Sequence, residues 1–384
     1  MKLSEFTYEL PKEKIAQFPL EKRDNAKLLV YKGGKITDSV FSKLPAVIPD
    51  DSFLVLNESK VIHARLYFPK VGGKDIEIFL LSPHDPKDIH LSLGAKKHCI
   101  WECYVGNLRR WKDGILTHDG VNVRRISTDN DVHLVEFTYD GVFSDVIQKH
   151  GHVPLPPYMK RDDAVTDEAA YQTVFASSAG SVAAPTAGLH YTKSLLTELS
   201  KKTTIGKITL HVGAGTFRPI QVDDISKHAM HSEAIEVSAE FIESLAAAVS
   251  SGKTIVCAGT TSLRTLESLY WVAVHIHDDK PLDVLQDNPP STLSVADALS
   301  ILKKYVKTHK IIYTTTSLFI TPGYSFKFAT ALQTNFHVPK STLLVLVAAF
   351  IGDDWKKVYS HALSNDYRFL SYGDTSLLFR NTHL

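Results

Sequence analysis

The chain has 384 residues, 44% of them hydrophobic, which is enough to bury a large core and favours two domains over one. Its 43 Lys and Arg residues nearly balance its 42 Asp and Glu residues, so no protein-wide field attracts a polyanion and any contact with nucleic acid depends on local patches. The opening MKLSEFTYEL lacks the apolar core of a secretion signal, and the apolar run Leu343–Ile351 is too short to span a bilayer. We therefore expect a cytoplasmic protein that makes no membrane contact.

The first half of the chain contains two kinds of predicted strand. The stretch DSFLVLN (51–57) indicates a buried strand that runs into a polar turn. From about Asn57 to Tyr158, apolar and polar residues instead alternate in twos, as in KDIEIFLL (74–81) and CIWECYV (99–105), with turn signals between the runs. This alternation predicts an all-β module.

After Gly180 the pattern changes to short buried strands, each followed by a polar loop and a helix. Such a succession is typical of an α/β layer architecture, and we expect the strand at 51–57 to pair with it, which leaves the all-β module as an insertion. A further stretch from 279 to 310 is predicted to be a helical excursion that starts at a capping box of Ser294 and Asp297. The three strand-and-helix units are 203–252 with a helix cap at Ser238, 253–274, and 310–352 with a helix cap at Ser341.

Three unusual motifs lie beside these strands and helices, and ligands of α/β proteins gather where parallel strands end. Their glycines match neither the dinucleotide-binding spacing nor the phosphate-binding loop, and tight turns explain such glycines equally well. We expect all three motifs to border one cleft. They are LHVGAGTFRPI (210–220), AGTTSLRTLES (258–268) and SVAAPTAGLHYT (181–192).

Histidines concentrate in and near these motifs. Any one of them can be a structural residue, but several beside glycine-rich loops favour proton transfer by at least one. His228 and His231 have metal-ligand spacing without a clear third ligand, and the three cysteines offer no second pair, so we expect no metal and three structural thiols. The candidates for proton transfer are His190, His211, His231 and His337.

Further motifs complete a combination that is specific as a whole: GHVPLPPYMKRDD (151–163), MHSEAIEV (230–237), TNFHVPKST (334–342) and DYRFLSYGD (366–374). With the motifs above, they closely resemble the S-adenosylmethionine:tRNA ribosyltransferase-isomerase family of queuosine biosynthesis. The resemblance implies a discontinuous α/β domain, residues 1–59 and 156–384, with an inserted β-barrel domain at 60–155. It also implies transfer of the ribosyl part of S-adenosylmethionine to 7-aminomethyl-7-deazaguanine at the wobble position of tRNA, by a monomer that needs no metal. The product is epoxyqueuosine, and adenine and methionine leave.

This chemistry gives roles to the residues of the motifs. A base must remove a proton beside the sulfonium, an acid must help adenine to leave, and histidine suits both steps; His211 and His337 are slightly favoured. Arg218 or Arg264 is a candidate for the methionine carboxylate, although an internal salt bridge is an equal alternative for either, and Glu233 is a candidate neighbour of the sulfonium. The predicted contacts of S-adenosylmethionine are Gly213, Gly215, Thr216, Arg218, Glu233, Thr260, Thr261, Arg264 and Asn335. Those of tRNA are Tyr158, Lys160, Arg161 and Arg368, whereas Arg109 to Lys112 are better explained as solvated charge.

The sequence departs from the family pattern at five positions within its motifs. Ser317 and Thr330 stand where the family has carboxylates. Lys60 replaces an arginine, His63 a proline and Ala234 an aromatic residue. Two other functions therefore stay open: a nonenzymatic tRNA-binding paralogue and an adenosyl-dependent transferase with another acceptor. The five departures are therefore at Ser317, Thr330, Lys60, His63 and Ala234.

Overall fold

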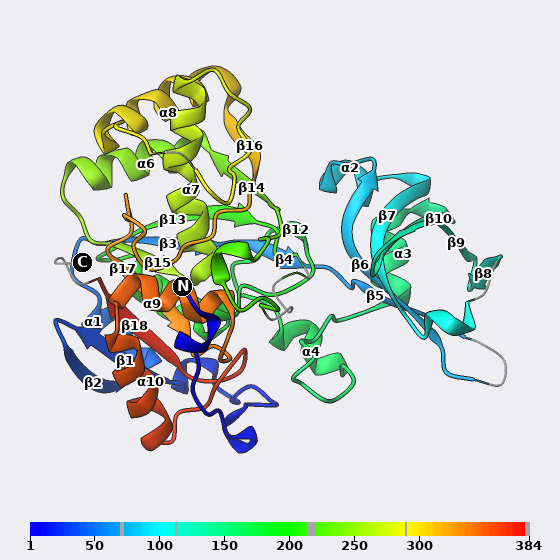
Figure 1. Ribbon diagram of the computed structural model, residues 1–384, viewed down its shortest axis with the longest axis horizontal. Helices are drawn as coiled ribbons and strands as arrows, with labels where there is room; N and C mark the ends of the chain where they lie inside the picture. Colours follow the sequence, from blue (N-terminus) through cyan, green and yellow to red (C-terminus); the bar gives the residue numbers. More distant parts are fainter. Residues whose placement is uncertain (70–72, 112–113, 214, 216–219, 289, 381–384) are drawn as a thin grey trace.

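The computed structural model describes residues 1–69, 73–111, 114–213, 215, 220–288 and 290–380. It contains a large sheet of nine strands and a second sheet of seven strands, which lie side by side with the short pair β4 (Ser59–Val61) and β12 (Ser178–Ser181) between them (Figure 1). The mixed α/β class predicted from the sequence is confirmed. Among the described helices, none combines the length and the apolar character that a membrane span needs.

The large sheet has a parallel centre. Strand β3 lies between β13 and β15 and pairs parallel with both, which confirms the expectation that 51–57 joins the strands of the later part. Strand β17 extends the parallel group on the other side of β15. In spatial order the strands are β16 (Ile311–Thr316), β14 (Glu233–Ser238), β13 (Thr204–Leu210), β3 (Phe53–Asn57), β15 (Ile255–Ala258), β17 (Ala331–Asn335), β18 (Thr375–Phe379), β1 (Lys27–Lys32) and β2 (Lys35–Val40).

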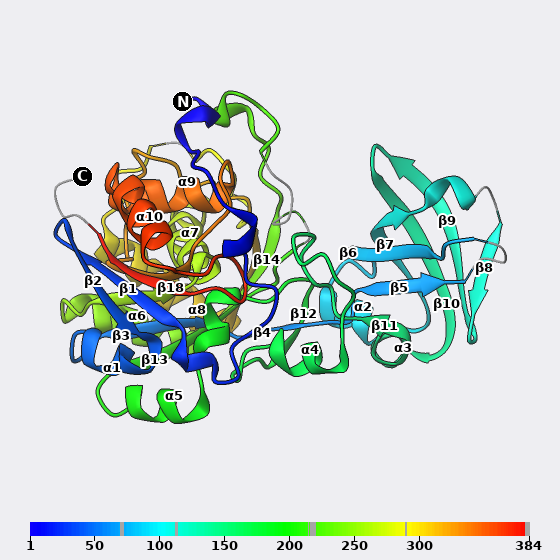
Figure 2. The ribbon, with the colours of Figure 1, turned by 90° about the horizontal axis from the view of Figure 1, so that it is seen from below.

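Helices cover both faces of this sheet, so its central strands read as continuous apolar runs. In β3, Phe53 and Val55 face one layer while Leu54 and Leu56 face the other. Figure 2 shows α1 and α5 on one side of the sheet and α9 and α10 on the other. The helices are α1 (Leu44–Val47), α5 (Lys193–Leu199), α6 (Ala239–Ser250), α7 (Thr260–His277), α8 (Val295–His309), α9 (Thr342–Ile351) and α10 (Asp354–Ser364).

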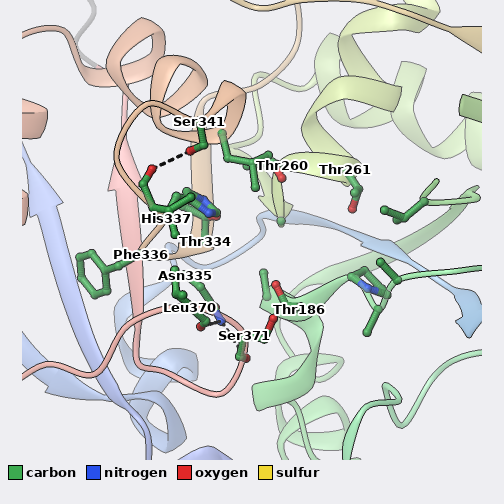
Figure 3. A pocket seen from close by; sticks show the side chains of 18 of the residues that line it. Thr186, Thr260, Thr261, Thr334, Asn335, Phe336, His337, Ser341, Leu370 and Ser371 are labelled. Atoms are coloured by element: carbon green, nitrogen blue, oxygen red, sulfur yellow. Dashed lines mark hydrogen bonds between the residues drawn. The ribbon is translucent and has the colours of Figure 1, made fainter. Parts of the chain in front are cut away.

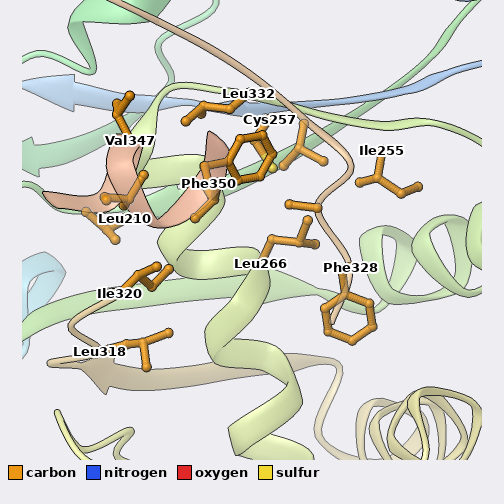
Figure 4. Close-up of a cluster of buried hydrophobic side chains, with 14 of the residues drawn as sticks. Leu210, Ile255, Cys257, Leu266, Leu318, Ile320, Phe328, Leu332, Val347 and Phe350 are labelled. Atoms are coloured by element: carbon orange, nitrogen blue, oxygen red, sulfur yellow. The ribbon is translucent and has the colours of Figure 1, made fainter. Parts of the chain in front are cut away.

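Helix α7 is the centre of the main core, where strands and helices pack around it (Figure 4). The predicted caps are confirmed: Ser238, Ser294 and Ser341 each accept the backbone N–H three residues later. Each cap satisfies a donor that the first turn of its helix leaves free, which is why α6, α8 and α9 begin at the predicted positions.

The second sheet is antiparallel and curled, and helix α3 packs against it. The rings of Phe68 in β5 and His118 in β8 come within 6.4 Å, yet no pairing within the described residues joins β8 to β5 or β11. The sheet is a half-barrel, and the expected β-barrel is corrected to this open form: its edge strands β8 and β11 are not hydrogen-bonded to each other, so the ladder that closes a barrel is missing among the described residues. The elements are β5 (Arg65–Phe68), β6 (Ile76–Asp85), α2 (Ile89–Leu93), β7 (Lys96–Gly106), β8 (Ile115–His118), β9 (Val121–Asp129), β10 (Val132–Val142), α3 (Phe143–His150) and β11 (Gly151–His152), and α4 (Val165–Ala170) follows them.

The third predicted unit also needs a correction. Its strand β16 pairs antiparallel with β14 at the margin of the sheet, and the parallel strand that precedes α9 is β17. Strand β17 reads ALQTN and was missed because its polar residues hide a buried strand. Gln333, Thr334 and Asn335 are all buried and form hydrogen bonds to other buried groups. The three cysteines are free and buried, as expected.

Candidate active site

A cavity of about 360 Å³ opens at the carboxyl ends of β13, β15 and β17. Its volume lies in the range of small-molecule sites, and most of its wall is apolar. The structure does bring the three motifs together here: Val212 follows β13, Gly259 to Thr261 follow β15, and Ala183 to Ala187 form the opposite wall. Other lining residues are Tyr158, Asn335, His337, Ser341, Leu370 and Ser371, and most of them are labelled in Figure 3.

The N-terminus of helix α7 forms one wall of the cavity. Gly259 precedes the helix with φ of 95°, a conformation that favours glycine, and a side chain there would also press on Ala187. The first N–H groups of a helix have no partner within it and carry partial positive charge, which suits an anionic ligand group. Thr260 and Thr261 begin the helix, and the buried Oγ1 of Thr261 has no hydrogen-bond partner among the described residues.

Asn335 is held rigidly at the end of β17. Its amide nitrogen donates to the carbonyl oxygens of Leu370 and Ser371, at 2.9 and 3.2 Å. Its oxygen therefore faces His190, whose Nε2 lies 2.9 Å away and must donate. Burial lowers the pKa of His190, and this imidazole does not line the cavity. The arrangement makes His190 a support for Asn335.

His337 does line the cavity. Its Nε2 lies 2.9 Å from the hydroxyl of Thr334, and its backbone N–H donates to the hydroxyl of Tyr359. Burial lowers the pKa of His337 to about 3. The imidazole is therefore neutral near pH 7.

A buried ion cluster lies next to the cavity, one turn along α7 from Thr261. The carboxylate of Glu233 is in hydrogen-bond contact with the Arg264 guanidinium and accepts the N–H of Gly213 at 3.0 Å, and His231 Nε2 lies 3.2 Å from it. Burial alone would raise the pKa of Glu233, but Arg264, with smaller help from His231 and Gly213, lowers it to about 2. Arg264 also donates to the carbonyl of Leu318 at 3.2 Å, so its guanidinium is engaged by internal partners.

Gly215 packs against the imidazole of His231. A Cβ atom at residue 215 would come within 2.4 Å of that ring, so the close approach requires glycine. Gly213 has more room, with the same ring 3.9 Å from a Cβ position. Thr216 and Arg218, two predicted contacts of S-adenosylmethionine, lie outside the described residues.

His211 faces away from the cavity, although the residue after it lines the wall. Its Nε2 lies 3.1 Å from Oε1 of Glu236, the same atom that His90 approaches at 2.8 Å. Its buried Nδ1 has no partner within the described part of the chain. His228 packs edge-on against Phe319.

The predicted tRNA contacts are placed unequally. Lys160 is exposed, whereas Tyr158 lines the cavity with its hydroxyl bonded to Ser371. Arg161 forms a two-pronged bond to Asp167, at 2.6 and 2.8 Å. Arg368 is partly exposed, 3.7 Å from Asp374. Of the segment 109–112, Lys112 lies outside the described residues, and the arginines 109 and 110 are exposed.

The departures from the family pattern lie mostly away from the cavity. Thr330 closes the amino ends of β15 and β17, where its hydroxyl accepts the N–H of Ile255 at 2.8 Å and donates to the carbonyl of the same residue. Ser317 follows β16, and its N–H donates to Val284. Lys60 is exposed, and His63 and Ala234 are partly buried. None of the five lines the cavity.

Thr186 and Ser371 are among the lining residues that the sequence did not single out as contacts. Both lie in motifs that carry the family resemblance, SVAAPTAGLHYT and DYRFLSYGD. The motif DYRFLSYGD is the signal in the sequence that could have pointed to Ser371. In the structure this segment passes beside β17, and the carbonyl oxygen of Ser371 accepts a hydrogen bond from the side-chain amide of Asn335.

The sequence profile of a family described as queuosine biosynthesis protein matches residues 3–378. A protein named S-adenosylmethionine:tRNA ribosyltransferase-isomerase from Halothermothrix orenii is 40% identical over 388 residues, 98% of this chain and 100% of the relative. One of the same name from an Azoarcus species is 37% identical over 385 residues, 100% of this chain and 99% of the relative. A crystal structure of S-adenosylmethionine tRNA ribosyltransferase from Thermotoga maritima is 29% identical and covers 98% of this chain and 100% of that one, at a TM-score of 0.49.

Proposed function

The chain belongs to the family of queuosine biosynthesis proteins, and from this we propose that it is an S-adenosylmethionine:tRNA ribosyltransferase-isomerase. It moves the ribosyl part of S-adenosylmethionine onto 7-aminomethyl-7-deazaguanine at the tRNA wobble position and releases adenine and methionine. The observation that carries this proposal is the cavity, because three separate motifs converge on one apolar space of about 360 Å³ beside a helix N-terminus.

S-adenosylmethionine has an apolar-walled space and an anion site to occupy in this cavity. The N-terminus of α7 suits the methionine carboxylate through the N–H groups of Thr260 and Thr261, and the unpartnered hydroxyl of Thr261 gains a partner there. Asn335, fixed by His190, lines the same space. These residues are our proposed contacts of S-adenosylmethionine.

The ion cluster has a different proposed role. Arg264 and Glu233 already engage each other in the interior, so a ligand carboxylate would have to displace Glu233 to reach the guanidinium. Glu233 also accepts the N–H of Gly213, and His231 packs on Gly215. We propose that this cluster fixes the path of the chain after β13 and thereby shapes the wall of the cavity.

His337 is the proposed proton-transfer residue. The sulfonium acidifies the neighbouring ribose C–H, and His337 lies at the wall of the cavity, where an imidazole can reach that proton. His337 is the one of the four predicted histidines whose side chain lines the cavity among the described residues. The imidazolium that forms can then return the proton, for example to the departing adenine.

The tRNA is proposed to approach across the loop at 156–161, between the two sheets. Tyr158 lines the cavity and offers a ring on which the splayed-out base can stack. The exposed Lys160 and the partly exposed Arg368 are available for phosphate contacts, while Arg161 is held by Asp167 and supports the loop from within.

The domain boundaries are proposed from the membership of the strands. All strands of the large sheet come from residues before 58 and after 203, and all strands of the half-barrel come from 65 to 152. This supports a discontinuous domain of residues 1–59 and 156–384 with an inserted domain at 60–155. We further propose that the protein works as a monomer in the cytoplasm, where its tRNA substrate is found.

The test is incubation with S-adenosylmethionine and tRNA that carries the deazaguanine precursor, with adenine release and nucleosides measured. Replacement His337→Gln should slow adenine release by roughly 10² to 10⁴ fold while tRNA affinity is kept. The control His361→Gln changes an imidazole that pairs with Asp38 on the surface, and it should leave the rate unchanged. If wild-type protein binds this tRNA but releases neither adenine nor methionine, the nonenzymatic paralogue is correct. Release of adenine with a different acceptor would favour the second alternative.

A further inference from the structure

We propose that His90, His211 and Glu236 form a binding site for a divalent transition-metal ion of the zinc class, at the junction of the two sheets. His90 lies on α2, on the side of the seven-stranded sheet that faces the large sheet (Figure 1). His211 follows β13 directly, and Glu236 lies on β14, both in the large sheet. This site goes beyond the proposed function and does not depend on it. It also departs from the expectation of no metal.

The three side chains already converge on one point. Oε1 of Glu236 is 2.8 Å from Nε2 of His90 and 3.1 Å from Nε2 of His211. One ligand atom from each residue lies within 4.8 Å of the other two, and the two rings are 5.9 Å apart. In a tetrahedral zinc site, ligand atoms at the usual bond lengths lie about 3.3 Å from one another. The two pairs that include Glu236 therefore need to change by only a few tenths of an ångström to admit the ion, and the exposed His90 can move to bring its nitrogen to the required separation from His211.

The donor set selects the class of metal. Two imidazoles and one carboxylate suit zinc, cobalt and nickel, whereas calcium and magnesium prefer oxygen ligands alone. The three residues differ in exposure: the His211 side chain is buried, Glu236 is 13% exposed and His90 is 49% exposed. Water can thus complete the coordination on the side of His90, and this exposed residue can adjust its position.

A metal here would join the half-barrel to the large sheet. His90 is the ligand from the seven-stranded side, and His211 and Glu236 hold the ion on adjacent strands of the other sheet. His211 immediately precedes Val212, which lines the cavity. Occupation of the site would therefore fix the orientation of α2 against the chain segment that leads to the cavity wall.

The test uses the full chain after removal of metals with a chelator, titrated with Co²⁺ and then Zn²⁺. We expect one equivalent of Co²⁺ with the visible absorption of a site of low coordination number, displacement by Zn²⁺, and a rise in melting temperature with added Zn²⁺. Replacement His90→Ala should weaken Zn²⁺ binding by at least about tenfold and remove that rise. Because His90 is half exposed, this variant should fold, whereas a change at the buried His211 would also disturb packing.

The chain offers a matched control. His98 is 45% exposed and its Nε2 lies 3.0 Å from Glu136, so it forms the same kind of pair without a second imidazole. Replacement His98→Ala should leave Zn²⁺ affinity unchanged, and Glu236→Gln should weaken it as His90→Ala does. The proposal is overturned if wild-type protein binds no stoichiometric Co²⁺ or Zn²⁺, or if His90→Ala and His98→Ala have the same affinity as each other.

Discussion

Two glutamates are buried in the main core, Glu267 within helix α7 and Glu233 at the start of β14, and their surroundings shift their pKa values in opposite directions. Glu267 accepts the backbone N–H groups of the segment 327–329 and the hydroxyl of Tyr324. Burial nevertheless raises its pKa. Glu233 is buried as deeply, yet the full positive charge of Arg264 outweighs the same burial and lowers its pKa to about 2.

The difference shows that the two buried carboxylates have different roles, which follow from the kinds of group that surround them. The partners of Glu267 are mostly backbone dipoles, and they belong to the chain that enters β17, the strand that ends at Asn335. The partners of Glu233 are mainly side chains, and they hold the segment that follows β13. One carboxylate therefore positions a strand, and the other balances a charge next to the cavity.

The largest effect is expected from removal of the charge that Glu233 faces. Replacement Arg264→Met leaves a buried, unpaired carboxylate and should lower the free energy of unfolding by about 3 to 5 kcal/mol, as measured by urea denaturation. The double variant with Glu233→Gln removes the unpaired charge and should recover part of the loss. A loss in the single variant no larger than for an exposed arginine such as Arg109→Met would contradict the assigned role of Arg264.

The pH dependence of stability should distinguish the two carboxylates by sign. A carboxyl whose pKa is lower in the folded state stabilises the fold above its ordinary pKa, and this contribution is lost as the pH falls. For Glu233, from 4.5 to about 2, it amounts to roughly 3 kcal/mol at neutral pH. The stability difference between wild type and Glu233→Gln should thus shrink as the pH is lowered from 4.5.

Glu267 should behave in the opposite way, because its folded pKa is raised and its protonated form is the one that the fold favours. The difference between wild type and Glu267→Gln should grow as the pH falls toward 4.5. Urea denaturation at a series of pH values measures both, and equal signs for the two variants would refute the assigned surroundings.

A smaller effect is expected from Glu267→Gln at neutral pH. The amide group of Gln turns a donor toward backbone N–H groups, so the substitution should cost about 1 to 3 kcal/mol of unfolding free energy. Glu198→Gln, on the exposed face of α5, is the control and should be near neutral. If both substitutions cost the same, the backbone contacts of Glu267 contribute nothing.

Most of the fold follows from local patterns in the sequence. Apolar runs predict β3, β13 and β15, and the serine caps predict where α6, α8 and α9 begin. Strand β17 does not follow from them, since it is buried through hydrogen bonds of polar side chains and not through apolar ones. The curl and the open edge of the half-barrel depend on contacts between distant strands, which alternation of residues does not encode.

The site was predictable as a set of motifs but not as a set of contacts. The meeting of three motifs at one cavity follows from the rule that parallel strands end at a common edge. The partners of each histidine do not: the fold pairs His211 with Glu236 and His190 with Asn335, and no spacing in the sequence indicates either pair. Thr330, a suspect as a lost carboxylate, lies at the opposite ends of the strands, and only the three-dimensional arrangement reveals that.

The smallest effect is expected from two threonine hydroxyl groups on helix α7, one with a hydrogen-bond partner and one without. Thr265 donates to the carbonyl of Thr261 at 3.0 Å, as a scaffold group does, whereas the buried Oγ1 of Thr261 lacks a partner within the described chain. Replacement Thr261→Val should therefore leave stability unchanged or raise it by up to about 1 kcal/mol, since a buried hydroxyl without a partner is costly. The same change should weaken S-adenosylmethionine binding by roughly fivefold in calorimetry, because it removes the hydroxyl that we propose forms a hydrogen bond to the ligand. Thr265→Val, the matched control one turn along, should lower stability by about 1 kcal/mol and leave binding unchanged. If Thr261→Val instead lowers stability and spares binding, its hydroxyl belongs to the scaffold, and the N-terminus of α7 is not where the ligand is held.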